Sequence, residues 1–204
     1  MSNPRNIFAK IGVAVALVLT IGTAAIAKTH SDPAFSNIHI RNFGKMDDRF
    51  YRGAQPDQSD YKDLKALGIS TIIDLTDSPK GYERSSVEAL GMRYVNIPMS
   101  DSSYPREDQV SAFLKLVNDP STGKFFVHCA GGRHRTGVMG AVYRFNVNHW
   151  TLDQAYNEMK DYDFYTRFGH GDLKTFVEDY SKRFQNNGAA AAAATTATAT
   201  TNKQ

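Results

Sequence analysis

The sequence contains a single cysteine, Cys129, among its 204 residues. One cysteine excludes an intramolecular disulfide, and the six histidines show no spacing that would build a zinc site with it. We therefore expect neither a metal nor a cofactor. The isolated thiol needs a different explanation.

The sequence also lacks a strong charge of either sign. Its formal net charge is +3, and Arg5 and Lys10 contribute two of these charges from a segment that we expect to be removed. A nucleic-acid-binding surface needs a much larger basic excess, so we expect no DNA or RNA partner. Hydrophobic residues make up 41% of the chain and charged residues 22%, which is enough for one packed core in a single domain.

The one long apolar run lies near the N-terminus, after Arg5 and Lys10. It covers residues 11–26, and residues 25–27 form an Ala-x-Ala site. This order is typical of a secretory signal peptide, which we place at 1–27. The chain is then expected to be secreted or periplasmic. Because the run is almost long enough to span a bilayer, the alternative is an uncleaved membrane anchor that carries an extracytoplasmic domain. We expect no other contact with a membrane.

The rest of the chain divides into three parts. Residues 28–42 form an N-terminal linker, and residues 43–185 alternate strand and helix signals. Residues 186–204 are mostly Ala and Thr without apolar periodicity, which predicts a disordered tail. The alternation in the middle part predicts a single α/β domain, with a central, mostly parallel sheet of four or five strands flanked by helices.

The individual elements follow from hydrophobic periodicity and from Gly and Pro at their ends. A capping box of Thr151 and Gln154 opens one helix. We predict strands at 49–52, 69–75, 92–97 and 124–128, and helices at 57–67, 82–90, 107–117, 136–147, 151–160 and 172–184.

The junction between the strand at 124–128 and the next helix carries the chemistry. Its sequence is His128-Cys129-Ala130-Gly131-Gly132-Arg133-His134-Arg135-Thr136. A glycine-containing loop before a helix can turn its N–H groups around a phosphate. The positive electrostatic potential at the N-terminus of that helix also stabilises a thiolate, and a cysteine placed there can have a pKa of about 3.5–7.5. Arg135 can fold back onto two phosphate oxygens. We predict that Cys129 is a nucleophile in a phosphate-binding loop of residues 130–135.

This pattern of His-Cys, five residues and Arg-Thr resembles the signature of the cysteine-based protein tyrosine and dual-specificity phosphatases. The resemblance covers residues 43–184 and includes Tyr51-Arg52-Gly53-Ala54-Gln55-Pro56 in the first half of the domain. The loop looks closest to the atypical dual-specificity phosphatases of plants, fungi and bacteria, from which Ala130 departs, since a basic residue is usual there. The resemblance implies a dual-specificity-phosphatase-like fold.

The resemblance also implies a role for each residue of the signature. Cys129 would attack phosphorus and form a phosphocysteine while Arg135 holds the equatorial oxygens. Thr136 would stabilise the thiolate when it leaves. His128 would support the loop from behind and affect the pKa of the thiol.

The general acid of this family lies on a loop upstream of the cysteine, and Asp101 occupies that kind of position. Asp108 is the competitor. It falls inside the helix predicted at 107–117, where a carboxylate near the N-terminus is more simply explained by the helix dipole.

Other polar residues near the loop have open or structural interpretations. Arg133 is either a phosphate or substrate contact or a solvated charge. We expect His134 to support the loop and His170 to be structural, since a histidine in a glycine-rich turn usually is. Arg52 and Gln55 are placed only at the border of the site.

The leading hypothesis is a metal-free phosphoester hydrolase acting on a phosphorylated protein or a small phosphoester. A non-catalytic phosphate-binding pseudophosphatase is one alternative. An inositol polyphosphate phosphatase is another, favoured by analogy because Arg133 and His134 are basic. A rhodanese-like sulfurtransferase is the third, although such loops close their arginine one residue earlier, where this chain has His134.

Overall fold

The computed structural model of the protein describes residues 35–201, with side chains to residue 187. The predicted signal peptide at 1–27 lies outside these residues. Within the described part, no helix is both long and apolar enough to cross a bilayer.

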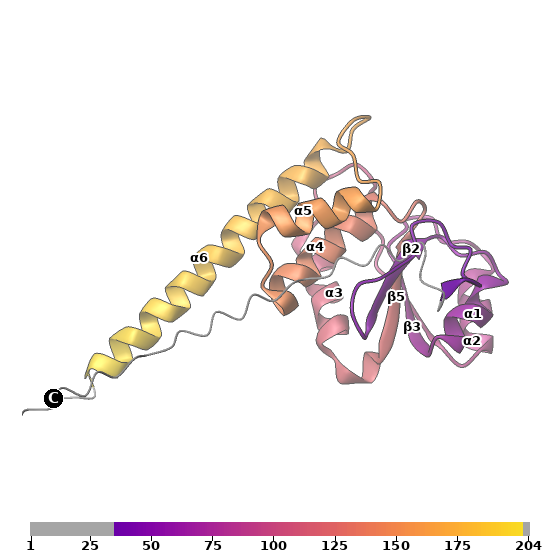
Figure 1. Cartoon of the computed structure of the whole chain (residues 1–204), viewed down its shortest axis with the longest axis horizontal. Helices are drawn as coiled ribbons and strands as arrows, with labels where there is room; N and C mark the ends of the chain where they lie inside the picture. The colour runs from indigo at the N-terminus through magenta and orange to yellow at the C-terminus, as the bar shows by residue number, and fades with distance from the viewer. Residues whose placement is uncertain (1–34, 202–204) are drawn as a thin grey trace, which may run out of the picture.

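Five strands form one sheet in the order β1-β2-β5-β3-β4 (Figure 1). β1 runs antiparallel to β2, and all other neighbours are parallel. The mostly parallel sheet predicted from the sequence is confirmed, although the two-residue β1 is too short to leave a periodic pattern. The strands are β1 (Gly44–Lys45), β2 (Phe50–Ala54), β3 (Ile69–Asp74), β4 (Arg93–Asn96) and β5 (Lys124–Cys129).

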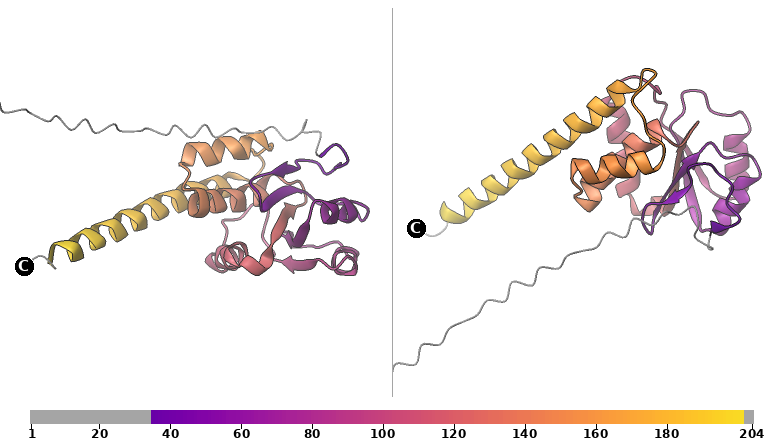
Figure 2. Two further views of the ribbon diagram at one scale, coloured as in Figure 1. Left: turned by 60° about the horizontal axis from the view of Figure 1, so that its bottom comes forward. Right: turned by 45° about the horizontal axis from the view of Figure 1, so that its top comes forward.

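Helices cover both faces of the sheet, as the views in Figures 1 and 2 show. One face carries α1 (Asp60–Ala66) and α2 (Glu83–Ala89). The other carries α3 (Glu107–Asn118), α4 (His134–Asn148), α5 (Leu152–Asp161) and α6 (Gly171–Thr201). A short 3-10 turn, Pro120–Thr122, connects α3 to β5.

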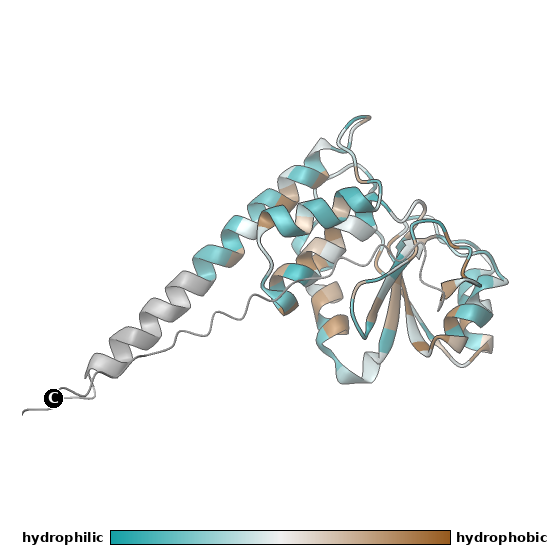
Figure 3. Ribbon diagram, viewed as in Figure 1, coloured by the Kyte–Doolittle hydropathy of each residue, from teal (hydrophilic) through white to brown (hydrophobic). Residues whose placement is uncertain are grey.

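The two helical layers enclose two hydrophobic cores, because successive side chains of a strand point to opposite faces. In β5, Phe125 and Val127 belong to the core under α3 and α4, whereas Phe126 belongs to the core under α1 and α2. Both faces are buried, which explains why this strand is a nearly continuous apolar run. Figure 3 shows apolar residues along the strands and on the helices that cover them.

Most predicted elements occur with shifted ends. The capping box of Thr151 and Gln154 is present at the start of α5. α4 begins at His134 rather than at residue 136. α6 continues to Thr201, into the segment for which the sequence predicted a disordered tail. Alanine has the highest helix propensity, so an Ala-rich segment can extend a helix that is already nucleated by packing.

The register of the parallel strands gathers their carboxyl ends at one edge of the sheet. Ala54 of β2 lies opposite Cys129 of β5, and Asp74 of β3 lies opposite His128. The segments that follow these strands therefore meet, at the edge where ligands bind in open α/β sheets.

Candidate active site

The turn between β5 and α4 is built to expose its N–H groups. Three consecutive carbonyl oxygens of the turn accept hydrogen bonds from residues outside it. With the carbonyls held outward, the N–H groups are left to face an anion. The bonds run from Gln55 N to Ala130 O (3.4 Å), from Asn42 Nδ2 to Gly131 O (2.8 Å) and from Arg52 Nη2 to Gly132 O (2.6 Å).

Gly132 fixes the turn against β2. Its φ is +66°, and an added Cβ would lie 2.5 Å from the carbonyl carbon of Gly53. A side chain would therefore meet both an unfavourable backbone conformation and a direct clash. Only glycine allows this approach of the loop to the neighbouring strand.

Arg52 is a buried cation behind the same turn, with an exposed fraction of 1%. Its guanidinium lies 4.0 Å from the ring centroid of Tyr162, and burial lowers its pKa. No carboxylate among the described residues forms an ion pair with it. Its bond to Gly132 makes it a support of the loop, a role that the sequence did not reveal.

Cys129 lies at the floor of the loop, 3% exposed. Burial by itself raises the pKa of its thiol. The Thr136 hydroxyl, the charge of Arg135 and the backbone N–H groups of Thr136 and Gly131 outweigh burial, so that the pKa is lowered. Thr136 Oγ1 has no other hydrogen-bond partner in the described chain. The site therefore favours the thiolate.

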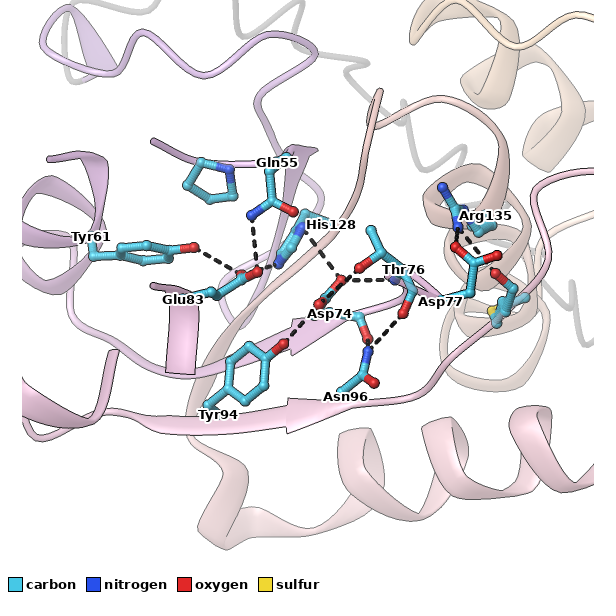
Figure 4. A network of polar contacts seen from close by, with 12 residues as sticks. Gln55, Tyr61, Asp74, Thr76, Asp77, Glu83, Tyr94, Asn96, His128 and Arg135 are labelled. Carbon is cyan, nitrogen blue, oxygen red and sulfur yellow. Dashed lines mark hydrogen bonds and ion pairs between the residues drawn. The ribbon is translucent and has the colours of Figure 1, made fainter. Parts of the chain in front are cut away.

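Arg135 lies in the first turn of α4 and connects three loops. Its Nη1 donates to Asp77 Oδ1 at 3.3 Å and to the carbonyl oxygen of Met99 at 3.0 Å, as part of the network in Figure 4. The guanidinium is thus held beside the loop, and its Nε–H group makes no hydrogen bond to the described residues. Asp77 belongs to no motif, and sequence reasoning missed it.

Behind Cys129, an ion pair supports the end of β5 (Figure 4). His128 Nε2 lies 2.7 Å from Glu83 Oε1, and both side chains are fully buried. Tyr61 Oη and Gln55 Nε2 also donate to Glu83, at 2.8 and 3.0 Å. Burial disfavours the charged form of both side chains. The hydrogen bond and the opposite charge of the partner outweigh burial, so that the pKa of His128 is raised and that of Glu83 is lowered.

Asp74 extends this buried network. It accepts bonds from Thr76 N at 2.7 Å, Thr76 Oγ1 at 3.0 Å and Tyr94 Oη at 2.7 Å. Asp74, Glu83 and His128 bring ligand-type atoms within 4.8 Å of one another, a set that could hold a metal ion. All four carboxylate oxygens already accept hydrogen bonds from protein groups, so the set is better described as a support for β5. The sequence indicated only His128.

Asp101 lies in the exposed loop between β4 and α3. Its carbonyl oxygen lies 2.8 Å from His170 Nδ1, and the ring of His170 stacks on that of His134. The histidine that we interpreted as structural thus contacts both the phosphate loop and the Asp101 loop. Asp108 is bound to Arg106 at the start of α3, at 2.9 Å, which fits its interpretation as a helix-terminal charge.

Arg133 extends away from the loop towards the segment after α5. Its Nε lies 3.7 Å from Asp163 Oδ2, and its guanidinium lies 6.0 Å from the ring centroid of Tyr165. The side chain is partly exposed, and its protein partner is a distant one.

Comparisons with known proteins identify the family of this chain. A family model described as a DSP-PTPase phosphatase fused to NAD+ kinase matches residues 32–177. A probable tyrosine-protein phosphatase, DG1060 of Dictyostelium discoideum, is 28% identical over 148 residues, which cover 70% of this chain and 85% of the relative. Inositol diphosphatase DSP1 of Oryza sativa is 28% identical over 124 residues, 57% of this chain and 54% of that protein.

A solved structure shares the fold of this chain. The crystal structure of TpbA from Pseudomonas aeruginosa superposes with a TM-score of 0.59 at 24% identity, covering 68% of this chain and 84% of TpbA. Since the family model covers most of the domain, the sulfurtransferase alternative is set aside. The chain belongs to the cysteine-based tyrosine and dual-specificity phosphatases, and it is a phosphatase enzyme.

Proposed function

We propose that this phosphatase is an exported phosphoester hydrolase that acts through a phosphocysteine intermediate on Cys129. One observation carries the proposed chemistry: the pKa of Cys129 is lowered at the floor of a turn whose carbonyls are held outward. Such a thiolate is a strong nucleophile beside a site for tetrahedral oxyanions.

In the first step, the Cys129 sulfur attacks phosphorus and the bond between phosphorus and the ester oxygen breaks. Arg135 and the loop N–H groups stabilise the transferring phosphoryl group. Asp101 gives its proton to the departing oxygen, so the alcohol leaves uncharged. The products are the free alcohol and a phosphocysteine.

In the second step, a water molecule attacks phosphorus and the phosphorus–sulfur bond breaks. Asp101, now a carboxylate, takes the proton of the water. Thr136 stabilises the thiolate as it leaves through the same hydrogen bond that lowers the pKa of the free thiol. Phosphate is released and Cys129 returns to its starting state.

Export is the part of the proposal that rests on the sequence at 1–27. The full chain, expressed in a bacterial host, should be recovered from the periplasm with a mature N-terminus at Lys28. A cytoplasmic chain that retains its first residues would contradict export. A membrane-bound, uncleaved chain would favour the anchor.

The substrate remains a choice between a phosphorylated protein and a small phosphoester such as an inositol polyphosphate. The rice relative is named as an inositol diphosphatase, and the Dictyostelium relative as a tyrosine-protein phosphatase. Initial rates on a phosphotyrosine peptide and on an inositol polyphosphate, compared at equal concentration, would separate the two.

Hydrolysis of p-nitrophenyl phosphate and of a phosphotyrosine peptide in EDTA tests the chemistry. Wild type should hydrolyse at least one of the two compounds, and Cys129→Ser should hydrolyse neither. Equal rates for the two proteins would contradict the mechanism. Binding of the peptide by wild type without hydrolysis of either compound would instead identify a pseudophosphatase.

A further inference from the structure

Two stacked histidine rings connect the phosphate loop to the segment before α6. The ring centroids of His134 and His170 lie 3.6 Å apart with planes at 14°, and Tyr165 packs edge-on against both. His134 is the first residue of α4 and is 9% exposed. Burial, followed by the charge of His170, lowers the pKa of His134 to about 4. His134 is therefore uncharged at neutral pH, and the stack contains no repulsion between like charges.

The same His170 ring holds the backbone of the loop that carries Asp101. A carbonyl oxygen can only accept, so His170 Nδ1 donates the 2.8 Å bond to Asp101 O. Earlier in this loop, the carbonyl oxygen of Met99 accepts a bond from Arg135 Nη1 at 3.0 Å. The Asp101 loop is thus fastened at two points, once by the arginine of the signature and once by His170.

The backbone before α6 bends sharply to bring His170 to this place. Phe168 and Gly169 both have positive φ, 59° and 86°. This conformation is unfavourable for phenylalanine, and Phe168 is 81% exposed, so burial of its own side chain offsets little of the strain. A Cβ added to Gly169 would be in ordinary van der Waals contact with Ser102 Cβ, at 3.9 Å, so the turn lies beside the Asp101 loop.

We propose that His170 is a positioning residue that fixes the Asp101 loop relative to the phosphate loop. The inference rests on the proposed function, in which Asp101 protonates the departing oxygen. A general acid must lie within hydrogen-bond reach of that oxygen. His170 maintains this distance because one face of its ring is fixed to His134 while its Nδ1 is bound to the backbone of Asp101.

The test compares kcat/KM of wild type, Asp101→Asn and His170→Ala for aryl phosphates whose phenols differ in acidity. Poor leaving groups depend on the acid, whereas p-nitrophenol needs it little. For the poorest leaving group, Asp101→Asn should lower kcat/KM by roughly 10²–10⁴-fold. His170→Ala should lower it by about tenfold, the worth of one hydrogen bond. His170→Ala should hardly change kcat/KM for p-nitrophenyl phosphate. The double variant should have the same kcat/KM as Asp101→Asn alone.

Two further variants provide the controls. His170→Asn keeps an N–H donor close to the position of Nδ1 but removes the ring, so it should recover part of the loss. If His170→Ala fails to fold, His170→Asn takes its place in the comparison, and its smaller loss should still be confined to the poor leaving groups. His149→Asn changes an exposed histidine at the far end of α4, in a left-handed conformation that asparagine tolerates, and should behave as wild type.

Equal loss for good and poor leaving groups after His170→Ala would overturn the inference. The inference would also be overturned if the two substitutions lowered kcat/KM independently, so that the double variant showed the product of the two single losses. The proposed function fails differently, through turnover that does not depend on Cys129. Turnover that depends on Cys129 but has an unchanged leaving-group dependence in His170→Ala would refute only the role of His170.

Discussion

Replacing Glu83 with glutamine should destabilise the protein strongly, although Glu83 is remote from any substrate. The carboxylate is fully buried and lies 2.7 Å from His128 Nε2. Removing one partner of a buried ion pair costs about 3–5 kcal/mol. We expect the lower end, about 3 kcal/mol, because His128 can release its proton and the introduced amide oxygen can still accept from Tyr61. For a domain of this size, that loss lowers Tm by about 6–12 °C.

The pH dependence of this loss has a definite sign. The pKa of His128 is raised, so its contribution to stability is complete below the ordinary histidine value of 6.5 and is lost as pH rises through the folded value. The pKa of Glu83 is lowered, so its contribution is complete above the ordinary value of 4.5 and is lost as pH falls through the folded value. The difference in Tm between wild type and Glu83→Gln should therefore be largest between these two values and shrink towards alkaline pH.

Thermal unfolding across this pH range, followed by circular dichroism, measures both effects. Glu88→Gln makes the same substitution in the same helix at a residue that is 54% exposed and paired only with Arg84, so its Tm should hardly change. A difference that stays constant with pH would refute the ion pair between His128 and Glu83. So would a Glu83→Gln protein as stable as Glu88→Gln.

Three further substitutions test the loop itself. Thr136→Ala removes a hydrogen bond to the thiolate and should slow alkylation of Cys129 by iodoacetamide at acidic pH by about tenfold or more, with Thr136→Ser close to wild type. Gly132→Ala should abolish measurable phosphatase activity while the protein stays folded by circular dichroism, because the new Cβ would clash with Gly53; retained activity would show that the turn can shift. Arg52→Met should weaken competitive inhibition by inorganic phosphate about tenfold without lowering Tm, because a buried cation without a carboxylate partner contributes little to stability; a lower Tm with unchanged inhibition would assign Arg52 to the fold alone.

The fold and the turn between β5 and α4 can be predicted because their signals are local. A strand of Phe and Val followed by glycines and a helix leaves a pattern in consecutive residues, so the predicted strand at 124–128 agrees with β5 to within one residue. The predicted start of the next helix is wrong by two residues because His134 and Arg135 are not apolar. In the first turn of α4, the ring of His134 instead stacks on that of His170, and Arg135 donates to Asp77 and to the Met99 carbonyl oxygen.

The supports of the loop could not be predicted because they come from distant segments. Asn42, Arg52 and Glu83 come from the segment before β1, from β2 and from α2. Only the folded sheet and the helix packed on it bring them to the end of β5. The sequence around Glu83 does not distinguish this buried glutamate from one on the surface. The contact of His170 with Asp101 escaped prediction for the same reason, since it joins residues 69 positions apart.

The covalent intermediate can be observed by stopping the reaction in acid and mapping the phosphate by peptide mass spectrometry. Asp101→Asn is the suitable protein, because loss of the proposed base should slow hydrolysis of the intermediate. The mechanism predicts phosphate on the peptide that contains Cys129, in an amount equal to the initial burst of released alcohol. A burst with phosphate on another residue, or steady turnover by Cys129→Ser, would contradict it.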